Sequence, residues 1–115
     1  MKPVIFLAEG FEESEALLPL DILRRGGIDA ITVSVSSERI VKSSHGVSVV
    51  ADAVIDEISA GDVQMIILPG GLPGATNLDA CEALDKLIMT FAAEAKPLAA
   101  ICAAPMVYGK RGLLK

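Results

Sequence analysis

The chain has 115 residues, which is enough for one domain and too few for two. Its 15 acidic and 10 basic side chains give a net charge of −5, which argues against the basic face that binds nucleic acid. The longest basic cluster is Arg24-Arg25, which is too short to recruit an acidic membrane. Hydrophobic residues make up 52% of the sequence and aromatic residues only 3%, so we expect an aliphatic core of the kind found in parallel sheets covered by helices.

The N-terminal part of the chain predicts a strand, a helix and a second strand. The apolar run over residues 4–8 is typical of a buried strand. Residues 12–25 predict a helix, with carboxylates in the first turn, arginines in the last and Gly26-Gly27 to end it. Pro19 should kink this helix or remove one of its hydrogen bonds. The β-branched run over residues 28–35 predicts the second strand.

The remaining elements follow the same alternation after one hairpin. Residues 40–42 and 47–51 predict two short β segments around the turn at 43–46. Further along we expect a strand over 65–68 closed by Pro69-Gly70-Gly71, a helix over 79–95, a strand over 98–101, and a helix from Ala104 that ends at Gly109 or Gly112.

Alternating strands and helices predict a single α/β domain over residues 1–115, with a parallel sheet and helices on both of its faces. Ligands gather at the carboxyl ends of such strands, where the loops 9–15, 69–75 and 102–104 should converge. In a doubly wound sheet we expect the first of these loops to lie beside the strand that carries Cys102. The sequence stops soon after a helix, so we expect a C-terminal portion to be missing, cleaved or supplied by another chain.

Cys102 is the candidate nucleophile. It follows the apolar run 97–101 and precedes Ala103-Ala104-Pro105, at a predicted junction of strand and helix. A helix N-terminus supplies N–H groups and a positive dipole end, and both favour the reactive thiolate. The alternative is a small buried apolar residue, the usual fate of a free cysteine.

Glu15 is the candidate partner of this thiol. A carboxyl group one turn into the first helix could face Cys102, and burial there would keep it protonated. A protonated Glu15 could donate a hydrogen bond to the thiolate and act as a general acid/base. The alternative is a water-exposed carboxylate at the start of a helix, which is also the interpretation for Glu12 and Glu13.

Gly71 and Ala103 are candidate oxyanion donors through their backbone N–H groups. The alternative for the Gly70-Gly71 pair is a plain turn after a strand. A nucleotide loop is disfavoured, because the glycine spacing is wrong, Pro73 lacks a donor and no Walker lysine follows. We therefore expect no cofactor.

The sequence offers too few cysteine and histidine side chains for a zinc site. Cys81, Cys102 and His45 are too few and too scattered for zinc, and we expect His45 to be solvated at a hairpin tip. Free thiols indicate a reducing compartment, the N-terminus is too short for a signal-peptide core, and no apolar run could cross a membrane. We therefore expect a cytoplasmic protein.

Three motifs together resemble the ThiJ/PfpI family, the superfamily of the Parkinson-disease protein deglycase, with a class I glutamine amidotransferase-like fold. They are Glu12-Glu13-Ser14-Glu15, Leu68-Pro69-Gly70-Gly71 and the stretch 99–105 around Cys102. The resemblance implies a flavodoxin-like three-layer sandwich, incomplete at the C-terminus here, and a homodimer. It implies that Cys102 is the nucleophile, Glu15 its protonated partner, and Gly71 and Ala103 the oxyanion donors. Family members continue beyond this length and often bring a histidine, so no third catalytic residue is assigned.

The function that follows is a cofactor-independent, cysteine-dependent glyoxalase or deglycase. Its substrates would be dicarbonyls such as methylglyoxal or early glycation adducts. Two alternatives use the same cysteine: a non-catalytic redox sensor or holdase chaperone, because an acidified thiolate oxidises readily, and a cysteine peptidase or amidase, which lacks a visible histidine partner.

Overall fold

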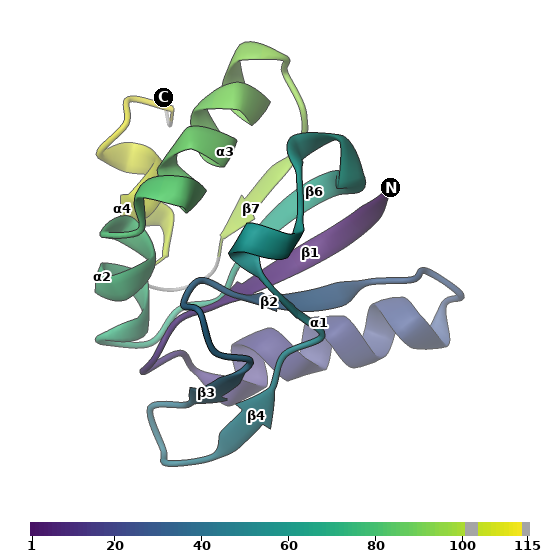
Figure 1. Cartoon of the computed structure of the whole chain (residues 1–115), viewed down its shortest axis with the longest axis vertical. Helices are drawn as coiled ribbons and strands as arrows, with labels where there is room; N and C mark the ends of the chain where they lie inside the picture. Colours follow the sequence, from purple (N-terminus) through teal and green to yellow (C-terminus); the bar gives the residue numbers. More distant parts are fainter. Residues whose placement is uncertain (101–103, 114–115) are drawn as a thin grey trace.

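The computed structural model describes residues 1–100 and 104–113, and in these ranges five strands form one parallel sheet (Figure 1). The strand order is β5-β2-β1-β6-β7, and each neighbouring pair is parallel. A separate antiparallel hairpin stands beside the sheet. The strands are β1 (Lys2–Leu7), β2 (Ile31–Ser34), β5 (Ala53–Val54), β6 (Val63–Leu68) and β7 (Leu98–Ala100), with β3 (Ile40–Lys42) and β4 (Ser48–Val50) in the hairpin.

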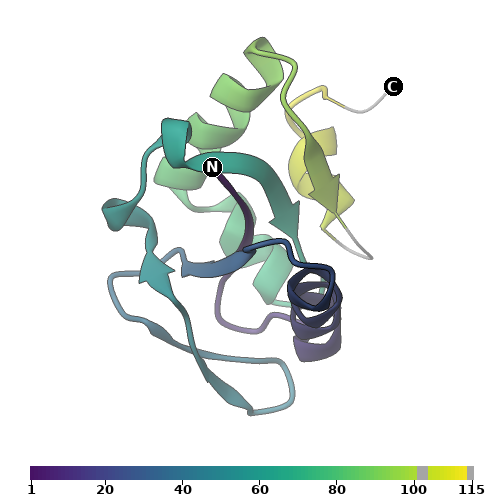
Figure 2. The same ribbon diagram turned by 90° about the vertical axis from the view of Figure 1, so that its right-hand side faces the viewer.

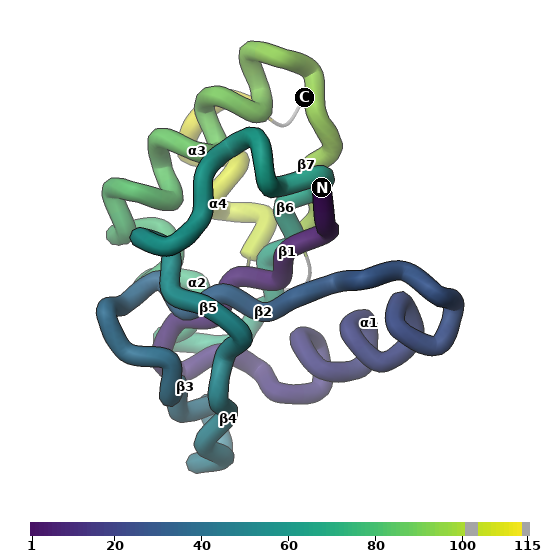
Figure 3. Tube along the Cα trace, turned by 45° about the vertical axis from the view of Figure 1, so that its right-hand side comes forward, coloured from purple at the N-terminus to yellow at the C-terminus, as the bar shows by residue number. Residues whose placement is uncertain are grey.

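Helices cover both faces of the sheet, which confirms the predicted α/β class. Helix α1 lies on one side, and α2, α3 and α4 lie on the other (Figures 1 and 3). No helix in the described ranges has the length and apolar character needed to span a bilayer. The helices are α1 (Glu13–Arg25), α2 (Gly74–Asp79), α3 (Glu82–Ala93) and α4 (Pro105–Gly109), with 3-10 turns η1 (Ile55–Glu57) and η2 (Ala60–Asp62) between β5 and β6.

The alternation of side chains along β1 divides the core into two layers. Val4 and Phe6 belong to the cluster on the side of α3 and α4, while Ile5 and Leu7 belong to the cluster on the side of α1. All four side chains are fully buried. A strand that is apolar on both faces belongs in the middle of a covered parallel sheet, and β1 occupies that central place.

Two predicted elements have different bounds in the structure. The helix expected over 79–95 is two helices, because the chain is extended at Cys81 (φ −80°, ψ 113°), which is the N-cap of α3. The second strand begins at Ile31, since the Ile28 N–H donates to the Leu23 carbonyl and keeps the preceding residues in a turn. Helix α1 continues through Pro19.

Helix α4 is attached to the sheet by a buried tyrosine. The Tyr108 hydroxyl donates a hydrogen bond of 2.9 Å to the Ala99 carbonyl in β7. Burial raises the pKa of Tyr108 well above its usual value, so the group stays a neutral donor. The contact ties together the strand before and the helix after residues 101–103.

Candidate functional site

The site lies where the strand order of the sheet reverses. From β1 the chain moves outward to β2 and β5, and it then returns to form β6 and β7 on the other side. In an open α/β sheet, ligands bind at the carboxyl ends of the two strands that flank this point. Here these strands are β1 and β6, and the loops that follow them are residues 8–12 and 69–73.

Hydrogen bonds join these two loops directly. The Glu12 N–H donates to the Gly70 carbonyl at 2.9 Å, and the Gly74 N–H donates to the Gly10 carbonyl at 3.2 Å. The Asn77 side-chain amide adds a bond of 2.7 Å to the Glu9 carbonyl. The loops therefore form one connected unit, although they are far apart in sequence.

Two glycines allow the loops to approach this closely. Gly71 has a φ of +93°, and a Cβ there would lie 2.5 Å from the Glu12 nitrogen. A Cβ at Gly74 would lie 2.6 Å from the Phe11 Cα. Both distances are too short for any side chain, so the contact requires glycine at these positions.

Glu15 extends from the first turn of α1 toward the second loop. Its Oε1 accepts a hydrogen bond of 2.9 Å from the Gly70 N–H. The structure thus brings together Glu15 and the Gly70-Gly71 turn, which the sequence placed at the same edge of the sheet. The roles of Glu15 as a proton carrier and of Gly71 as an oxyanion donor stay predictions.

The expected neighbour of the first loop is corrected by the strand order. We expected this loop to lie beside the strand that carries Cys102, but β6 separates β1 from β7. The reversal point falls between β1 and β6, so it is the β6 loop that contacts the first loop. Cys102 and Ala103 lie outside the described residues, and their roles as nucleophile and oxyanion donor stay predictions.

The β3–β4 hairpin borders the site, which the sequence did not indicate. The Gly10 N–H donates to the Lys42 carbonyl at 2.9 Å, and the Ser44 N–H donates to the Phe11 carbonyl at 2.8 Å. His45 was expected to be merely solvated. Its side chain is 66% exposed, yet its Nδ1 lies 2.6 Å from Glu13 Oε1, so the imidazole pairs with the start of α1.

Glu12, Glu13 and His45 could place three metal-ligand atoms within 4.8 Å of one another. These groups already have partners within the protein. Glu12 caps α1 by accepting hydrogen bonds from Ser14, while Glu13 and His45 bond to each other. The cluster therefore has a structural role, and the prediction of no metal remains untested.

The Glu13 carboxyl has a lowered pKa, caused first by the Ser43 hydroxyl and to a smaller extent by His45. A lowered pKa in the folded state stabilises the fold above the unfolded value near 4.5, and this contribution is lost as the pH falls through the folded value. We expect Ser43→Ala to raise the pKa of Glu13 toward 4.5. Carboxyl NMR titration would measure the shift, with Ser59→Ala as the control. An unchanged value in Ser43→Ala would contradict the assignment.

Comparisons with known proteins agree with this geometry. The chain is 39% identical over 115 residues to protein DJ-1 homolog B of Arabidopsis thaliana. The alignment covers 99% of this chain and 26% of that protein. It is 31% identical over 111 residues to a Caenorhabditis elegans protein named as a glutathione-independent glyoxalase, covering 96% of this chain and 59% of that one. The chain thus spans less than two thirds of these relatives.

Solved structures match the fold closely. Oxidized DJ-1 from Toxoplasma gondii superposes with a TM-score of 0.93 at 38% identity, over 98% of this chain and 62% of that one. A cysteine-to-alanine mutant of a DJ-1 superfamily protein from Salmonella typhimurium superposes with a TM-score of 0.92 at 40% identity. The match covers 100% of this chain and 63% of that one. The family model for DJ-1/PfpI matches residues 1–115. The chain therefore belongs to the DJ-1/PfpI family.

Proposed function

We propose that the chain carries the catalytic loops of a cofactor-independent glyoxalase or deglycase that acts on dicarbonyls such as methylglyoxal, or on early glycation adducts. The observation that carries the proposal is the hydrogen bond from the Gly70 N–H to Glu15 Oε1, at the point where the strand order reverses. It fixes a carboxyl group beside the backbone amides of a glycine turn, where an acid/base and an oxyanion donor are needed together. The similarity to a named glutathione-independent glyoxalase supports the same reaction class.

The proposed reaction uses a thiolate, a carboxyl group and two backbone N–H groups of this chain, and one water. The Cys102 thiolate adds to the aldehyde carbon of methylglyoxal and forms a hemithioacetal, whose oxyanion is stabilised by the Gly71 and Ala103 N–H groups. Glu15 gives its proton to this oxyanion, and its carboxylate can then take the proton from the same carbon. That proton returns to the adjacent carbonyl carbon while the hydroxyl proton passes to the oxygen of that carbonyl, which leaves a lactoyl thioester. Water then cleaves the carbon–sulfur bond, releasing lactate and the thiol. The sum is methylglyoxal plus water giving lactate, with no net oxidation.

Hydrogen bonds hold α1 and the two loops of the site in place, which supports the role proposed for Glu15. Glu15 belongs to a helix that is capped by Glu12 and paired to the hairpin through Glu13 and His45. The second loop is bonded to the first at Gly10, Glu12 and Glu9. Small displacements of an acid/base group are costly to catalysis, so this bracing suits the role given to Glu15. A homodimer and a cytoplasmic location remain predictions from the family resemblance and from the cysteine usage.

The test is an assay of lactate formed from methylglyoxal, with the chain as wild type, Cys102→Ala and Cys81→Ala. We expect turnover in the wild type and in Cys81→Ala, since Cys81 lies at the N-cap of α3 with its thiol toward the Val35 carbonyl, and none in Cys102→Ala. Equal rates in Cys102→Ala and wild type would refute the proposal. Absence of turnover, with mild peroxide adding oxygen only at Cys102 in intact-mass spectra, would instead favour redox sensing.

A further inference from the structure

The single tyrosine of the sequence, Tyr108, bridges the strand and the helix that flank residues 101–103. Its side chain is buried, with 3% exposed, and its hydroxyl donates to the Ala99 carbonyl of β7 at 2.9 Å. Figure 2 shows α4, in yellow, beside β7, in yellow-green. The hydrogen bond therefore closes a ring of chain over residues 99–108.

The position of Tyr108 is fixed from both of its ends. The side chain belongs to the core cluster on the side of α3 and α4, and its hydroxyl also lies 3.5 Å from the Ile66 carbonyl of β6. The Tyr108 backbone carbonyl accepts hydrogen bonds of 3.1 Å from the N–H groups of Arg111 and Leu113. The Arg111 guanidinium is bonded in turn to Asp79 of α2. Tyr108 thus relates the position of α4 to the sheet.

The hydroxyl of Tyr108 is not needed to fill the core. A phenylalanine would make the same apolar contacts without bringing a polar group out of water. A buried hydroxyl that has a partner adds little net stability, because its hydrogen bond replaces one to water. Its distinct effect is geometric, since a satisfied buried hydrogen bond favours one arrangement of the groups that it joins.

We propose that Tyr108 is a positioning residue for Cys102, the nucleophile of the proposed function on which this inference rests. Cys102 lies three residues after Ala99 and six before Tyr108 in the sequence. The hydrogen bond between Tyr108 and Ala99 holds the two described ends of the short connection that carries Cys102. A change in the separation of these ends would rearrange the connection, and small displacements of a reacting group are costly.

The test measures the reactivity of Cys102 directly, through the pH profile of its alkylation by iodoacetamide. The reference protein and all variants carry Cys81→Ala, which leaves Cys102 as the only thiol. Tyr108→Phe removes the hydroxyl and keeps the ring. We expect it to move the midpoint of the profile upward by about half a pH unit or more, toward the value of about 8.5 for an ordinary thiol. The reason is that the N–H groups of a loosened turn stabilise a thiolate less well.

Thr32→Val is the matched control. Thr32 is 3% exposed, and its hydroxyl donates to Asp52 Oδ2 at 3.2 Å. It lies on β2, which β1 and β6 separate from β7. The control also removes a buried hydroxyl with little change of shape, so urea unfolding should show that both variants lose stability. Its alkylation profile should equal that of the reference protein.

A second measurement leaves the Tyr108 hydroxyl in place. Because the sequence has one tyrosine, 3-fluorotyrosine labels position 108 alone. Alkylation of Cys102 should move the fluorine NMR signal of this label, since the two residues share the ring of chain that the hydrogen bond closes. Circular dichroism will show that the alkylated protein keeps its fold, and this measurement decides the matter if Tyr108→Phe does not fold.

A profile that shifts in Tyr108→Phe and not in Thr32→Val supports the inference. Equal profiles in Tyr108→Phe and the reference protein, equal shifts in both variants, or a fluorine signal that alkylation leaves in place would overturn it. A shifted profile without turnover of methylglyoxal refutes the proposed reaction and leaves the positioning role intact. An ordinary thiol profile in the reference protein overturns both, because no activated nucleophile would then exist.

Discussion

Gly74→Ala is expected to destabilise the chain by about 2–3 kcal/mol and to separate the two loops of the site. The new Cβ would lie 2.6 Å from the Phe11 Cα and 2.7 Å from the Phe11 nitrogen, and both are backbone atoms that no rotamer change can move. The strain can be relieved only if the β6 loop withdraws from the β1 loop. That movement would break the Gly74 N–H bond to the Gly10 carbonyl and shift the Gly70 N–H away from Glu15.

Urea unfolding would measure the loss of stability, and NMR of the Gly70 amide would report the local change. The control is Gly61→Ala in η2, where a Cβ meets no atom within 4 Å. Its stability should change by less than about 0.5 kcal/mol, as for most surface substitutions. If Gly74→Ala unfolded at the same urea concentration as the control, the interlocked loops would not be the constraint that the geometry indicates.

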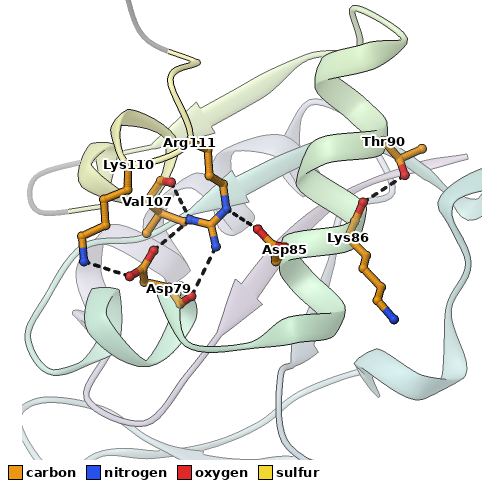
Figure 4. Close-up of polar contacts among 7 residues, drawn as sticks. All are labelled: Asp79, Asp85, Lys86, Thr90, Val107, Lys110 and Arg111. Carbon is orange, nitrogen blue, oxygen red and sulfur yellow. Dashed lines mark hydrogen bonds and ion pairs between the residues drawn. The ribbon is translucent and has the colours of Figure 1, made fainter.

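Arg111→Ala is the second large effect that we expect, with a loss of about 2–3 kcal/mol. The Arg111 side chain is only 12% exposed and joins three elements (Figure 4). Its guanidinium donates to Asp79 at 2.8 Å, to Asp85 at 2.6 Å and to the Val107 carbonyl at 2.6 Å. Removing it leaves the partly buried Asp79 with Lys110 as its remaining cation, at 3.0 Å.

The cost of Arg111→Ala should depend on pH. The hydrogen bond from Arg111 is the largest cause that lowers the pKa of Asp79 below its ordinary value of 3.8. A lowered folded-state pKa stabilises the fold above the unfolded value, and the contribution disappears as the pH falls through the folded value. The difference between wild type and Arg111→Ala should therefore be largest near neutral pH and shrink below pH 3.8.

Thermal unfolding at several pH values would test this dependence. Arg111→Lys keeps the charge but lacks the planar fork, so it should recover only part of the stability. Arg25→Ala is the matched control, because Arg25 and its partner Asp21 are 79% and 53% exposed and such surface pairs contribute little. A pH-independent loss in Arg111→Ala would mean that packing, and not the Asp79 pair, accounts for the effect.

The elements of this fold could be predicted where local pattern decides them. The apolar run at 4–8 predicted β1, the charges and glycines around 12–27 predicted α1, and the alternation of elements predicted the parallel sheet. The break at Ala80 and Cys81 was not predicted, because the helical spacing of Ala80, Ala83 and Leu84 continues into α3. Leu78 of α2 and Leu84 of α3, on either side of the break, are buried in the same core cluster.

The sequence predicted which residues lie at the site, but it did not predict the hydrogen bonds that connect them. Glu15 and the Gly70-Gly71 turn were correctly placed at the same edge, since the carboxyl ends of parallel strands share an edge. The bonds of Asn77 to Glu9 and of His45 to Glu13, which border the site, join residues that are distant in sequence. Such contacts depend on how loops pack, and no periodicity in the sequence records them.

The central position of β1 and β6 has a consequence for how the nascent chain acquires its structure. β1 ends at Leu7, but its neighbour β6 begins only at Val63. At a synthesis rate of about 5–20 residues per second, several seconds pass before the ribosome delivers the second of these strands. During that interval one edge of β1 has no partner and can pair with strands of other chains until β6 is made.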